Sequence, residues 1–279
     1  MRTSFTPTTQ SFKHSVIQSL ATSAFQRLLT IMDELREQCP WDRKQTFLSL
    51  RKLTIEETYE LADELLKEDL TGIKEEVGDL LLHMVFYAKI ASEQGAWDIA
   101  DALNTVCDKL INRHPHIYGD VVAEDEEAVK RNWEQIKLKE GKGKKTVLSG
   151  VPRALPAMVK AMRMQEKTGQ FGFDWDNRRQ VWDKVREEME EFYQAAEVEK
   201  DAAHAEEEFG DLLFSLVNYA RWQGIDPETA LERTNQKFIR RFEYVERMAG
   251  DNGLAATPLA QMEAWWQAAK TAGTDPQPS

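Results

Sequence analysis

The chain has 279 residues and a formal net charge of −12, from 48 acidic and 36 basic side chains. This length allows one large domain or two small ones, and an apolar fraction of 42% is enough to bury a core. Because nucleic-acid phosphates attract Lys and Arg, a chain this acidic is not expected to have nucleic acid as a partner.

Cysteine content and hydropathy exclude two further classes of protein. The two cysteines, Cys39 and Cys107, are too few for a disulfide scaffold and favour a reduced cytoplasmic setting. No apolar run approaches the ~20 residues that a membrane-spanning helix needs. We therefore expect a cytoplasmic protein with no membrane partner.

The N-terminus differs in composition from the rest of the chain. Residues 1–32 contain no Asp or Glu and many Ser and Thr, together with Arg2, Lys13 and Arg27. Such a composition is typical of an organellar transit peptide, but no amphipathic Arg-rich face stands out. We interpret residues 1–27 as an N-terminal extension, unstructured or helical, of a cytoplasmic protein.

Helical periodicity runs through almost the whole chain. Apolar residues recur at helical spacing, as at Leu28, Ile31, Met32 and Leu35, and β-branched runs bounded by turns are missing. The sequence therefore predicts an all-α fold. The expected helices span residues 16–37, 47–67, 70–93, 98–112 and 125–139, followed by 154–168, 178–200, 202–222, 227–249 and 258–270.

A segment rich in glycine, lysine and proline separates these two sets of helices. Its Gly-Lys-Gly-Lys-Lys run superficially resembles a phosphate-binding loop, but the glycine spacing is wrong and no strand precedes it. We interpret residues 141–156 as a linker between an N-terminal domain, 28–140, and a C-terminal domain, 157–270. Residues 271–279 are expected to form a frayed tail.

The two halves are copies of one another. A Glu-Glu-x-x-Glu motif at 56–60 precedes a Glu-x-Gly-Asp motif at 76–79, and both motifs recur in the same order at 187–191 and 208–211. The following residues also match, Leu-Leu-Leu-His-Met-Val-Phe-Tyr-Ala in the first half against Leu-Leu-Phe-Ser-Leu-Val-Asn-Tyr-Ala in the second. Letters that keep their order and spacing in this way indicate a tandem duplication.

The duplicated acidic motifs predict a metal site in each half. Carboxylates three residues apart share one helix face, and a turn lets the second helix of each pair fold back on the first. Four facing carboxylates repel one another unless a hard cation with oxygen ligands, such as Mg²⁺, neutralises them. The predicted ligands are Glu57, Glu60, Glu76 and Asp79, and then Glu188, Glu191, Glu208 and Asp211.

A solvated acidic helix face is the alternative in so acidic a chain, but matched pairs in both halves favour the metal site. Gly78 and Gly210 support this, because glycine in a helix costs roughly 1 kcal/mol relative to Ala. Close approach by another helix or a ligand would justify that cost, whereas a helix that begins after the glycine would remove it. No histidine lies three residues after a Glu, which argues against a di-iron site.

Magnesium accepts phosphate oxygens, so the predicted site suits hydrolysis of phosphate esters or phosphoanhydrides. Lys237, Arg240 and Arg241 share one or two helix faces and can meet a triphosphate. Trp266 can stack on a base, and Lys270 one turn later can reach the same ligand. The alternative for the three basic residues is a solvated helix face, and the alternative for Trp266 is packing in the core.

The combined pattern resembles the MazG-type nucleoside triphosphate pyrophosphohydrolases, from about Leu28 to Lys270. The resemblance implies an all-α homodimer that hydrolyses NTPs or dNTPs to nucleoside monophosphate and pyrophosphate with Mg²⁺, with general hydrolysis credited to the C-terminal half. Beside the acidic motifs, it is carried by Cys39-Pro-Trp-Asp42, Arg113-His-Pro-His116, Trp133-Glu-Gln-Ile-Lys137, Gly172-Phe-Asp-Trp175 and Lys237-Phe-Ile-Arg-Arg241.

The resemblance also assigns roles by motif match. Glu188, Glu191, Glu208 and Asp211 would bind Mg²⁺, and Glu187 is a candidate base that orients the attacking water. One departure is His204, which stands just before the second acidic motif, where the family can carry a Lys. The residues that would contact the nucleotide are Lys184, Glu187, Lys237, Arg241 and Trp266.

Two other classes of function stay open. The N-terminal half can be a binding or regulatory module that sets the geometry of the dimer. The whole chain can also be a helical nucleotide-binding or interaction protein whose acidic sites are vestigial.

Overall fold

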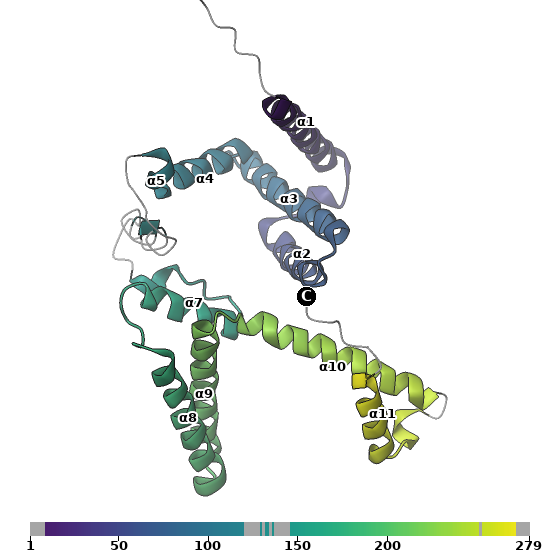
Figure 1. Ribbon diagram of the computed structural model, residues 1–279. Helices are drawn as coiled ribbons and strands as arrows, with labels where there is room; N and C mark the ends of the chain where they lie inside the picture. Colours follow the sequence, from purple (N-terminus) through teal and green to yellow (C-terminus); the bar gives the residue numbers. More distant parts are fainter. Residues whose placement is uncertain are drawn as a thin grey trace, which may run out of the picture. The chain divides into compact units, whose positions relative to one another are not determined.

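The computed structural model describes residues 9–119, 146–250 and 253–271, with side chains from residue 17, and a few single positions between 129 and 136. Every regular element in this part of the chain is helical (Figure 1). The predicted all-α class is therefore confirmed. The chain divides into two units, residues 1–121 and 122–279, which are described separately.

The N-terminal unit is built around an antiparallel helix pair. Thr46 and Ser49 form a reciprocal cap at the start of α2, Glu68 ends α2 in the left-handed region at φ 57°, and the Asp69 side chain caps α3. Helix α1 packs across α3. The elements are α1 (Thr9–Gln38), η1 (Asp42–Lys44), α2 (Phe47–Lys67), α3 (Leu70–Glu93), α4 (Ile99–Arg113) and α5 (Pro115–Tyr118).

The core of this unit lies where α1, α2 and α3 meet. Met32, Leu50, Val85, Phe86 and Ile90 form one buried cluster, with exposed fractions of 4% or less. Burying such side chains stabilises the fold by ~1.5–3 kcal/mol each. The cluster fixes the relative rotation of α2 and α3, and so decides which of their faces point toward each other.

The C-terminal unit repeats the antiparallel pair and adds three further helices. Helices α8 and α9 pack along their length, joined through a π-helical turn that ends at Lys200 with φ 57°. Helix α7 covers α9, and α11 packs on α10 (Figure 1). The elements are η2 (Val147–Gly150), α7 (Ala157–Gly169), α8 (Arg178–Tyr193), η3 (Gln194–Glu199), α9 (Ala202–Trp222), α10 (Pro227–Ala249), η5 (Leu254–Ala256) and α11 (Leu259–Thr271).

The helix bounds agree closely with the sequence prediction. The spans predicted for α2, α3, α9 and α10 are identical to those observed. Helix α1 begins earlier than predicted, so much of the expected N-terminal extension is helical, and the helix predicted over 178–200 ends in the π-helix. The helix predicted over 125–139 lies largely outside the described residues, as do residues 1–8, 141–145 and 272–279.

The predicted domain limits stay a prediction. The two units meet between residues 121 and 122, upstream of the predicted linker, in which residues 147–150 form η2. No helix in the part of the chain that the structure describes is long and apolar enough to cross a membrane.

Candidate functional site

Helices α8 and α9 bring three carboxylates of the C-terminal half to one point. One oxygen from each of Glu188, Glu191 and Glu208 lies within 4.8 Å of the others. Glu188 and Glu191 stand one turn apart on α8, and Glu208 faces them from the antiparallel α9, because the π-helical turn reverses the chain between them. An all-oxygen set at this spacing suits a hard divalent cation such as Mg²⁺.

The electrostatics of this cluster reflect crowding of negative charge. Burial, followed by the neighbouring charge of Glu188, raises the pKa of Glu191. The Lys184 ammonium lies 2.6 Å from Glu187 Oε1 and 2.7 Å from Glu188 Oε1, and these two hydrogen bonds raise the pKa of Lys184. Lys184 therefore balances one carboxylate of the cluster and leaves the others to repel.

His204 adds a second contact to the same cluster. Its ring nitrogens lie 2.9 Å from Glu199 Oε2 and 3.1 Å from Glu208 Oε1. The hydrogen bond to Glu199 is the main cause that raises the pKa of His204. Since Glu199 belongs to the π-helix, this irregular turn fixes a residue that holds Glu208 in place. The acidic motifs in the sequence did not indicate this bridge.

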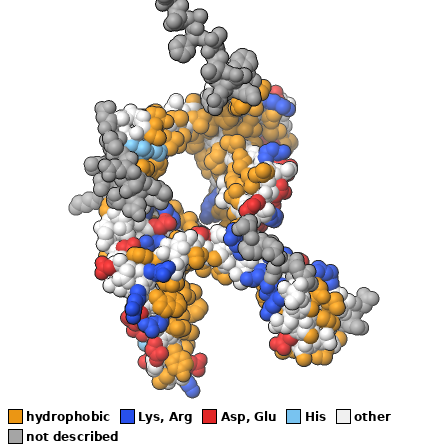
Figure 2. All heavy atoms as spheres, viewed as in Figure 1, with side chains coloured by type: hydrophobic (Ala, Val, Ile, Leu, Met, Phe, Trp, Pro, Cys, Tyr) orange, Lys and Arg blue, Asp and Glu red, His pale blue; other side chains and the backbone are white. Residues whose placement is uncertain are grey.

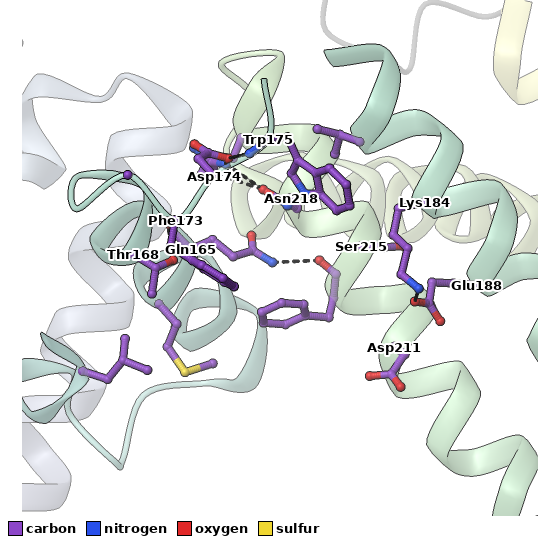
Figure 3. A pocket seen from close by; sticks show the side chains of 16 residues that line it. Gln165, Thr168, Phe173, Asp174, Trp175, Lys184, Glu188, Asp211, Ser215 and Asn218 are labelled. Atoms are coloured by element: carbon purple, nitrogen blue, oxygen red, sulfur yellow. Dashed lines mark hydrogen bonds and ion pairs between the residues drawn. The ribbon is translucent and has the colours of Figure 1, made fainter. Parts of the chain in front are cut away.

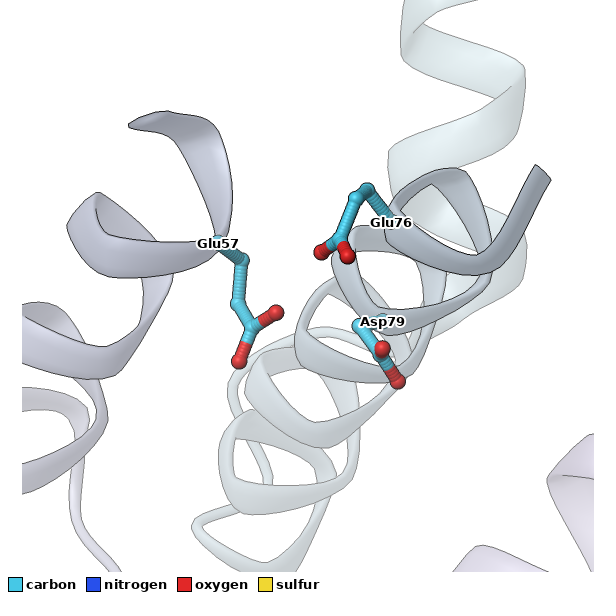
Figure 4. A group of neighbouring side chains, drawn as sticks. All are labelled: Glu57, Glu76 and Asp79. Carbon is cyan, nitrogen blue, oxygen red and sulfur yellow. The ribbon is translucent and has the colours of Figure 1, made fainter. Parts of the chain in front are cut away.

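The N-terminal half holds an equivalent cluster (Figure 4). Glu57 on α2 faces Glu76 and Asp79 on α3, with one oxygen from each within 4.8 Å of the others. Burial, together with the neighbouring carboxylates, raises the pKa of both Glu57 and Glu76. Glu76 Oε2 is buried without a hydrogen-bond partner among the described residues. A bound cation would supply a partner for this oxygen.

In each half, therefore, three of the four predicted ligands come together. Glu60 is exposed and outside the N-terminal group, although its charge helps to raise the pKa of Glu76. Asp211 lies outside the group of three but lines the same pocket as Glu188. Whether these carboxylates bind metal stays a prediction.

Gly78 and Gly210 both lie inside helices, eight residues after the first residue of α3 and of α9. The account in which a helix begins after the glycine is therefore wrong. A Cβ added at either position would meet no described atom within 4 Å, so no neighbouring helix in the described chain explains the glycine. A ligand beside the acidic motif stays as the explanation that the sequence suggested.

A large pocket opens beside the C-terminal carboxylates (Figure 3). It has a volume of about 580 Å³, within the usual range of small-molecule sites. Lys184, Glu188 and Asp211 line one part of it. The rest is lined from α7, α9 and the Gly172-Phe-Asp-Trp175 segment, and includes Gln165, Phe173, Trp175, Phe214, Ser215, Asn218 and Arg221. Sequence reasoning missed Gln165 and Asn218; only the motif at 172–175 pointed to this part of the chain.

The remaining predicted substrate residues lie elsewhere in the C-terminal unit. Trp266 packs against Phe238, with ring centroids 5.0 Å apart, and the Arg241 guanidinium lies 5.8 Å from the Trp266 ring. Trp266 lines a second pocket of about 510 Å³ between α10 and α11. Side chains that line the pocket of Glu188 within the described chain do not include Glu187, Lys237, Arg240, Arg241, Trp266 or Lys270.

Comparisons with known proteins agree with the repeat and the acidic motifs. The model of the MazG nucleotide pyrophosphohydrolase domain matches residues 45–118 and again 178–246. This chain belongs to the MazG family. Both acidic motif pairs of this MazG-family protein fall inside the matched segments, and the double match confirms that its halves are repeats.

Full-length relatives cover most of this MazG-family chain. An Escherichia coli (strain K12) protein named "Nucleoside triphosphate pyrophosphohydrolase" is 45% identical over 252 residues, which make up 88% of this chain and 96% of that protein. A Thermotoga maritima protein named "Nucleoside triphosphate pyrophosphohydrolase/pyrophosphatase MazG" is 42% identical, over 88% of this chain and 95% of its own. The YabN protein of Bacillus subtilis is 41% identical over 51% of its own length.

Proposed function

We propose that this protein hydrolyses nucleoside triphosphates, NTPs or dNTPs, to nucleoside monophosphate and pyrophosphate with Mg²⁺, and that the C-terminal half carries the reaction. The observation that carries the proposal is the three-carboxylate cluster at the edge of a pocket of about 580 Å³. Relatives named nucleoside triphosphate pyrophosphohydrolase support the substrate and the products.

The choice of the C-terminal half rests on a difference between the repeats. Asn218 lines the pocket, whereas the matching residue of the first half, Phe86, is 2% exposed and belongs to the hydrophobic core. Ser215 is likewise matched by His83, which is buried and has a pKa lowered by that burial. Larger side chains therefore fill this region in the N-terminal half, which favours a binding or regulatory role there.

The chemistry follows from groups at the pocket edge. Glu188, Glu191 and Glu208 would hold the ion, with Asp211 beside them, and bound Mg²⁺ supplies positive charge for the triphosphate. Lys184, now paired with Glu187 and Glu188, can turn one ammonium hydrogen to a phosphate oxygen.

Water attacks the α-phosphorus in this proposal. The new bond joins the water oxygen to that phosphorus, and the bond from the phosphorus to the bridging oxygen of pyrophosphate breaks. Glu187 is the candidate that accepts the proton of the water. Lys237, Arg241 and Trp266 are proposed to contact the nucleotide, with Arg240 and Lys270 as further candidates.

We also propose that the protein works as a cytoplasmic homodimer. Support comes from large apolar side chains that stay exposed on helices of the C-terminal unit, and the space-filling view shows such orange patches on its surface (Figure 2). They include Phe209 and Leu213 on α9, at 46% and 42% exposed, and Phe238 and Ile239 on α10, at 56% and 53%. A second copy that covers these faces would also bring further basic side chains to the pocket, which Lys237, Arg240 and Arg241 do not line in a single chain.

Product analysis tests the proposed reaction. Purified full-length protein is incubated with a panel of NTPs and dNTPs, with Mg²⁺ or with a chelator. Nucleoside monophosphate and pyrophosphate, formed only with Mg²⁺, are expected. Nucleoside diphosphate and phosphate would reject the proposal, and no turnover would favour the alternative, a helical nucleotide-binding or regulatory protein. Analytical ultracentrifugation of the same sample tests the homodimer.

A further inference from the structure

The wall of the pocket away from the carboxylates carries a polar side chain with an unused acceptor. Gln165 on α7 is 6% exposed and lines the pocket. Its Nε2 donates a hydrogen bond to the backbone oxygen of Phe214 on α9, at 2.9 Å (Figure 3). Its Oε1 is buried and has no hydrogen-bond partner among the described residues.

This arrangement fixes which atom of Gln165 is the acceptor. Because Nε2 is bonded to a carbonyl, which only accepts, Oε1 is the atom left for another partner. A buried acceptor without a partner destabilises a protein and calls for an explanation. The terminal torsion of a glutamine is soft, so a small turn of the amide presents Oε1 to a ligand in the pocket.

Asn218 on α9 offers the complementary group. Its Oδ1 accepts hydrogen bonds from Arg221 Nε at 3.1 Å and from Arg221 Nη2 at 2.8 Å. The amide Nδ2 is therefore its remaining donor. Arg221 is itself anchored, because Asp174 Oδ1 accepts from Arg221 Nη2 at 2.5 Å and from Trp222 Nε1 at 3.1 Å. These bonds hold Asn218 in one orientation.

We propose that this wall is the nucleobase pocket, in which Gln165 accepts and Asn218 donates a hydrogen bond to the edge of the base. The proposal rests on the proposed function, because the carboxylates in the same pocket would then hold the triphosphate end. The Watson–Crick edge of each common base carries a donor beside an acceptor, which matches this pair. Trp175, 40% exposed and also in the pocket wall, supplies an aromatic face for stacking.

The role of the Gly172-Phe-Asp-Trp175 segment follows from this assignment. Gly172 turns the backbone at φ 83°, a conformation that favours glycine, and Asp174 then meets Arg221 while Trp175 lines the pocket. The segment thus anchors Arg221, which in turn bonds Asn218, and it supplies the aromatic surface for stacking. In the N-terminal half the position of Asn218 is taken by Phe86. The acceptor–donor pair of Gln165 and Asn218 therefore has no counterpart there and belongs to the half proposed to be catalytic.

The test measures binding of the base itself, without metal and without turnover. Isothermal titration calorimetry compares nucleoside monophosphates (AMP, CMP, GMP and UMP) with ribose 5-phosphate, which lacks a base. The variants are Gln165→Met, which removes the acceptor, and Asn218→Asp, which replaces the donor but keeps an oxygen for Arg221. Gln170→Met is the matched control, because Gln170 has a buried Oε1 without a partner but does not line the pocket.

The wild-type protein is expected to bind at least one monophosphate more tightly than ribose 5-phosphate. Gln165→Met and Asn218→Asp should each reduce that preference by about 5- to 150-fold, the range for loss of a good base contact. Binding of ribose 5-phosphate and the preference of Gln170→Met should stay unchanged. A wild-type protein without the preference, or variants that weaken both ligands equally, would overturn the proposal.

The same variants separate this proposal from the proposed function. NTP hydrolysis is measured in parallel with Mg²⁺. Base-dependent binding without any hydrolysis would reject the hydrolase and keep the base pocket. Hydrolysis in which Gln165→Met and Asn218→Asp retain the wild-type KM for every NTP would keep the hydrolase and reject the base pocket.

Discussion

The Glu191 carboxylate is expected to lower the stability of the metal-free protein and yet to be necessary for the proposed reaction. Burial and the charge of Glu188 raise its pKa, which means that the ionised form of Glu191 is disfavoured in the folded protein. Glu191→Gln is therefore expected to leave the metal-free protein at least as stable as wild type. Hydrolysis should fall by roughly 100-fold or more, since a charged ligand matters at least as much as the residues that only support a ligand.

Steady-state kinetics and thermal melting check this expectation. Glu190→Gln is the matched control, because Glu190 is exposed, lies next to Glu191 and pairs with Gln194 at 2.8 Å outside the carboxylate group. It should keep near-normal activity. Near-normal turnover in Glu191→Gln would show that the three carboxylates form an acidic surface and no metal site.

Gly210 poses a second question for a single residue. It lies inside α9, and an added Cβ would meet no described atom within 4 Å. Gly210→Ala should therefore stabilise the helix by ~0.5–1 kcal/mol, which raises the melting temperature by a few degrees. Gly78→Ala should act in the same way on α3.

The two glycines should differ in their effect on turnover. If a nucleotide approaches the backbone beside the C-terminal motif, Gly210→Ala raises the KM for NTP several-fold, while Gly78→Ala leaves it unchanged. A lower melting temperature in Gly210→Ala would instead point to a neighbour that packs on this face of α9, such as a second copy of the chain.

At the scale of elements, the two helix hairpins predict a pH dependence of stability. The pKa values of Glu57, Glu76 and Glu191 are raised in the folded protein above 4.5. A raised carboxyl pKa means that the folded state holds the proton more tightly than the unfolded state. The resulting stabilisation is fully present below about pH 4.5 and is lost as the pH rises through the folded pKa values.

Melting curves from pH 4.5 to 7, with and without Mg²⁺, isolate this contribution from other titrating groups. Mg²⁺ competes with protons for the same oxygens, so it should raise the melting temperature at pH 7 and have little effect near pH 4.5. The double variant Glu57→Gln, Glu191→Gln should show a smaller response to Mg²⁺. A response that is the same at both pH values would contradict the expectation.

The elements also show what sequence reasoning can and cannot reach. Helix bounds were predictable because the spacing of apolar residues, helix caps such as Asp69 and turn residues all act locally. The hairpin topology followed from motif spacing, and three of the four carboxylates predicted as ligands in each half lie close together. The π-helical turn and its Glu199–His204–Glu208 bridge were not predictable. The segment between the two acidic motifs, 192–207, is one residue longer than its counterpart, 61–75, and one extra residue leaves no periodic signal.

The pocket wall was missed for a different reason. Gln165 on α7 lines the same pocket as Asn218 and Arg221 on α9 only because the two helices pack together. Neither amide belongs to a run of charge or to a motif that sequence reasoning had singled out for chemistry. The sequence pattern favours Trp266 instead. Its proposed stacking on a base stays a prediction, and in the structure its ring packs against Phe238.

At the scale of the whole molecule, the tandem repeat gives two similar helical frames, which differ at a few positions. Both frames keep an antiparallel helix pair and three converging carboxylates. They differ at positions that face inward: Asn218 and Ser215 in the C-terminal half are matched by Phe86 and His83 in the N-terminal half. Phe86 packs in a core with Met32, Leu50, Val85 and Ile90, whereas Asn218 lines the pocket of the C-terminal half.

Exchanging these residues tests whether this one difference decides which half acts on nucleotide. Asn218→Phe introduces the N-terminal residue into the pocket and removes the acceptor of Arg221, so NTP hydrolysis should fall by roughly 100-fold or more, as expected when a site loses the geometry that positions its substrate. The carboxylates are untouched, and the rise in melting temperature on addition of Mg²⁺ should persist. That persistence separates loss of the pocket from loss of the metal site.

The reverse change, Phe86→Asn, removes an aromatic ring that is 2% exposed and packs under Arg36 at 5.5 Å. It should destabilise the N-terminal unit by ~3–5 kcal/mol, as large-to-small core substitutions do, without adding hydrolysis in an Asn218→Phe background. Restored hydrolysis in that double variant would mean that the N-terminal frame needs only an open pocket to act. An Asn218→Phe protein with wild-type activity would place the nucleotide outside this pocket and favour the second pocket, which Trp266 lines.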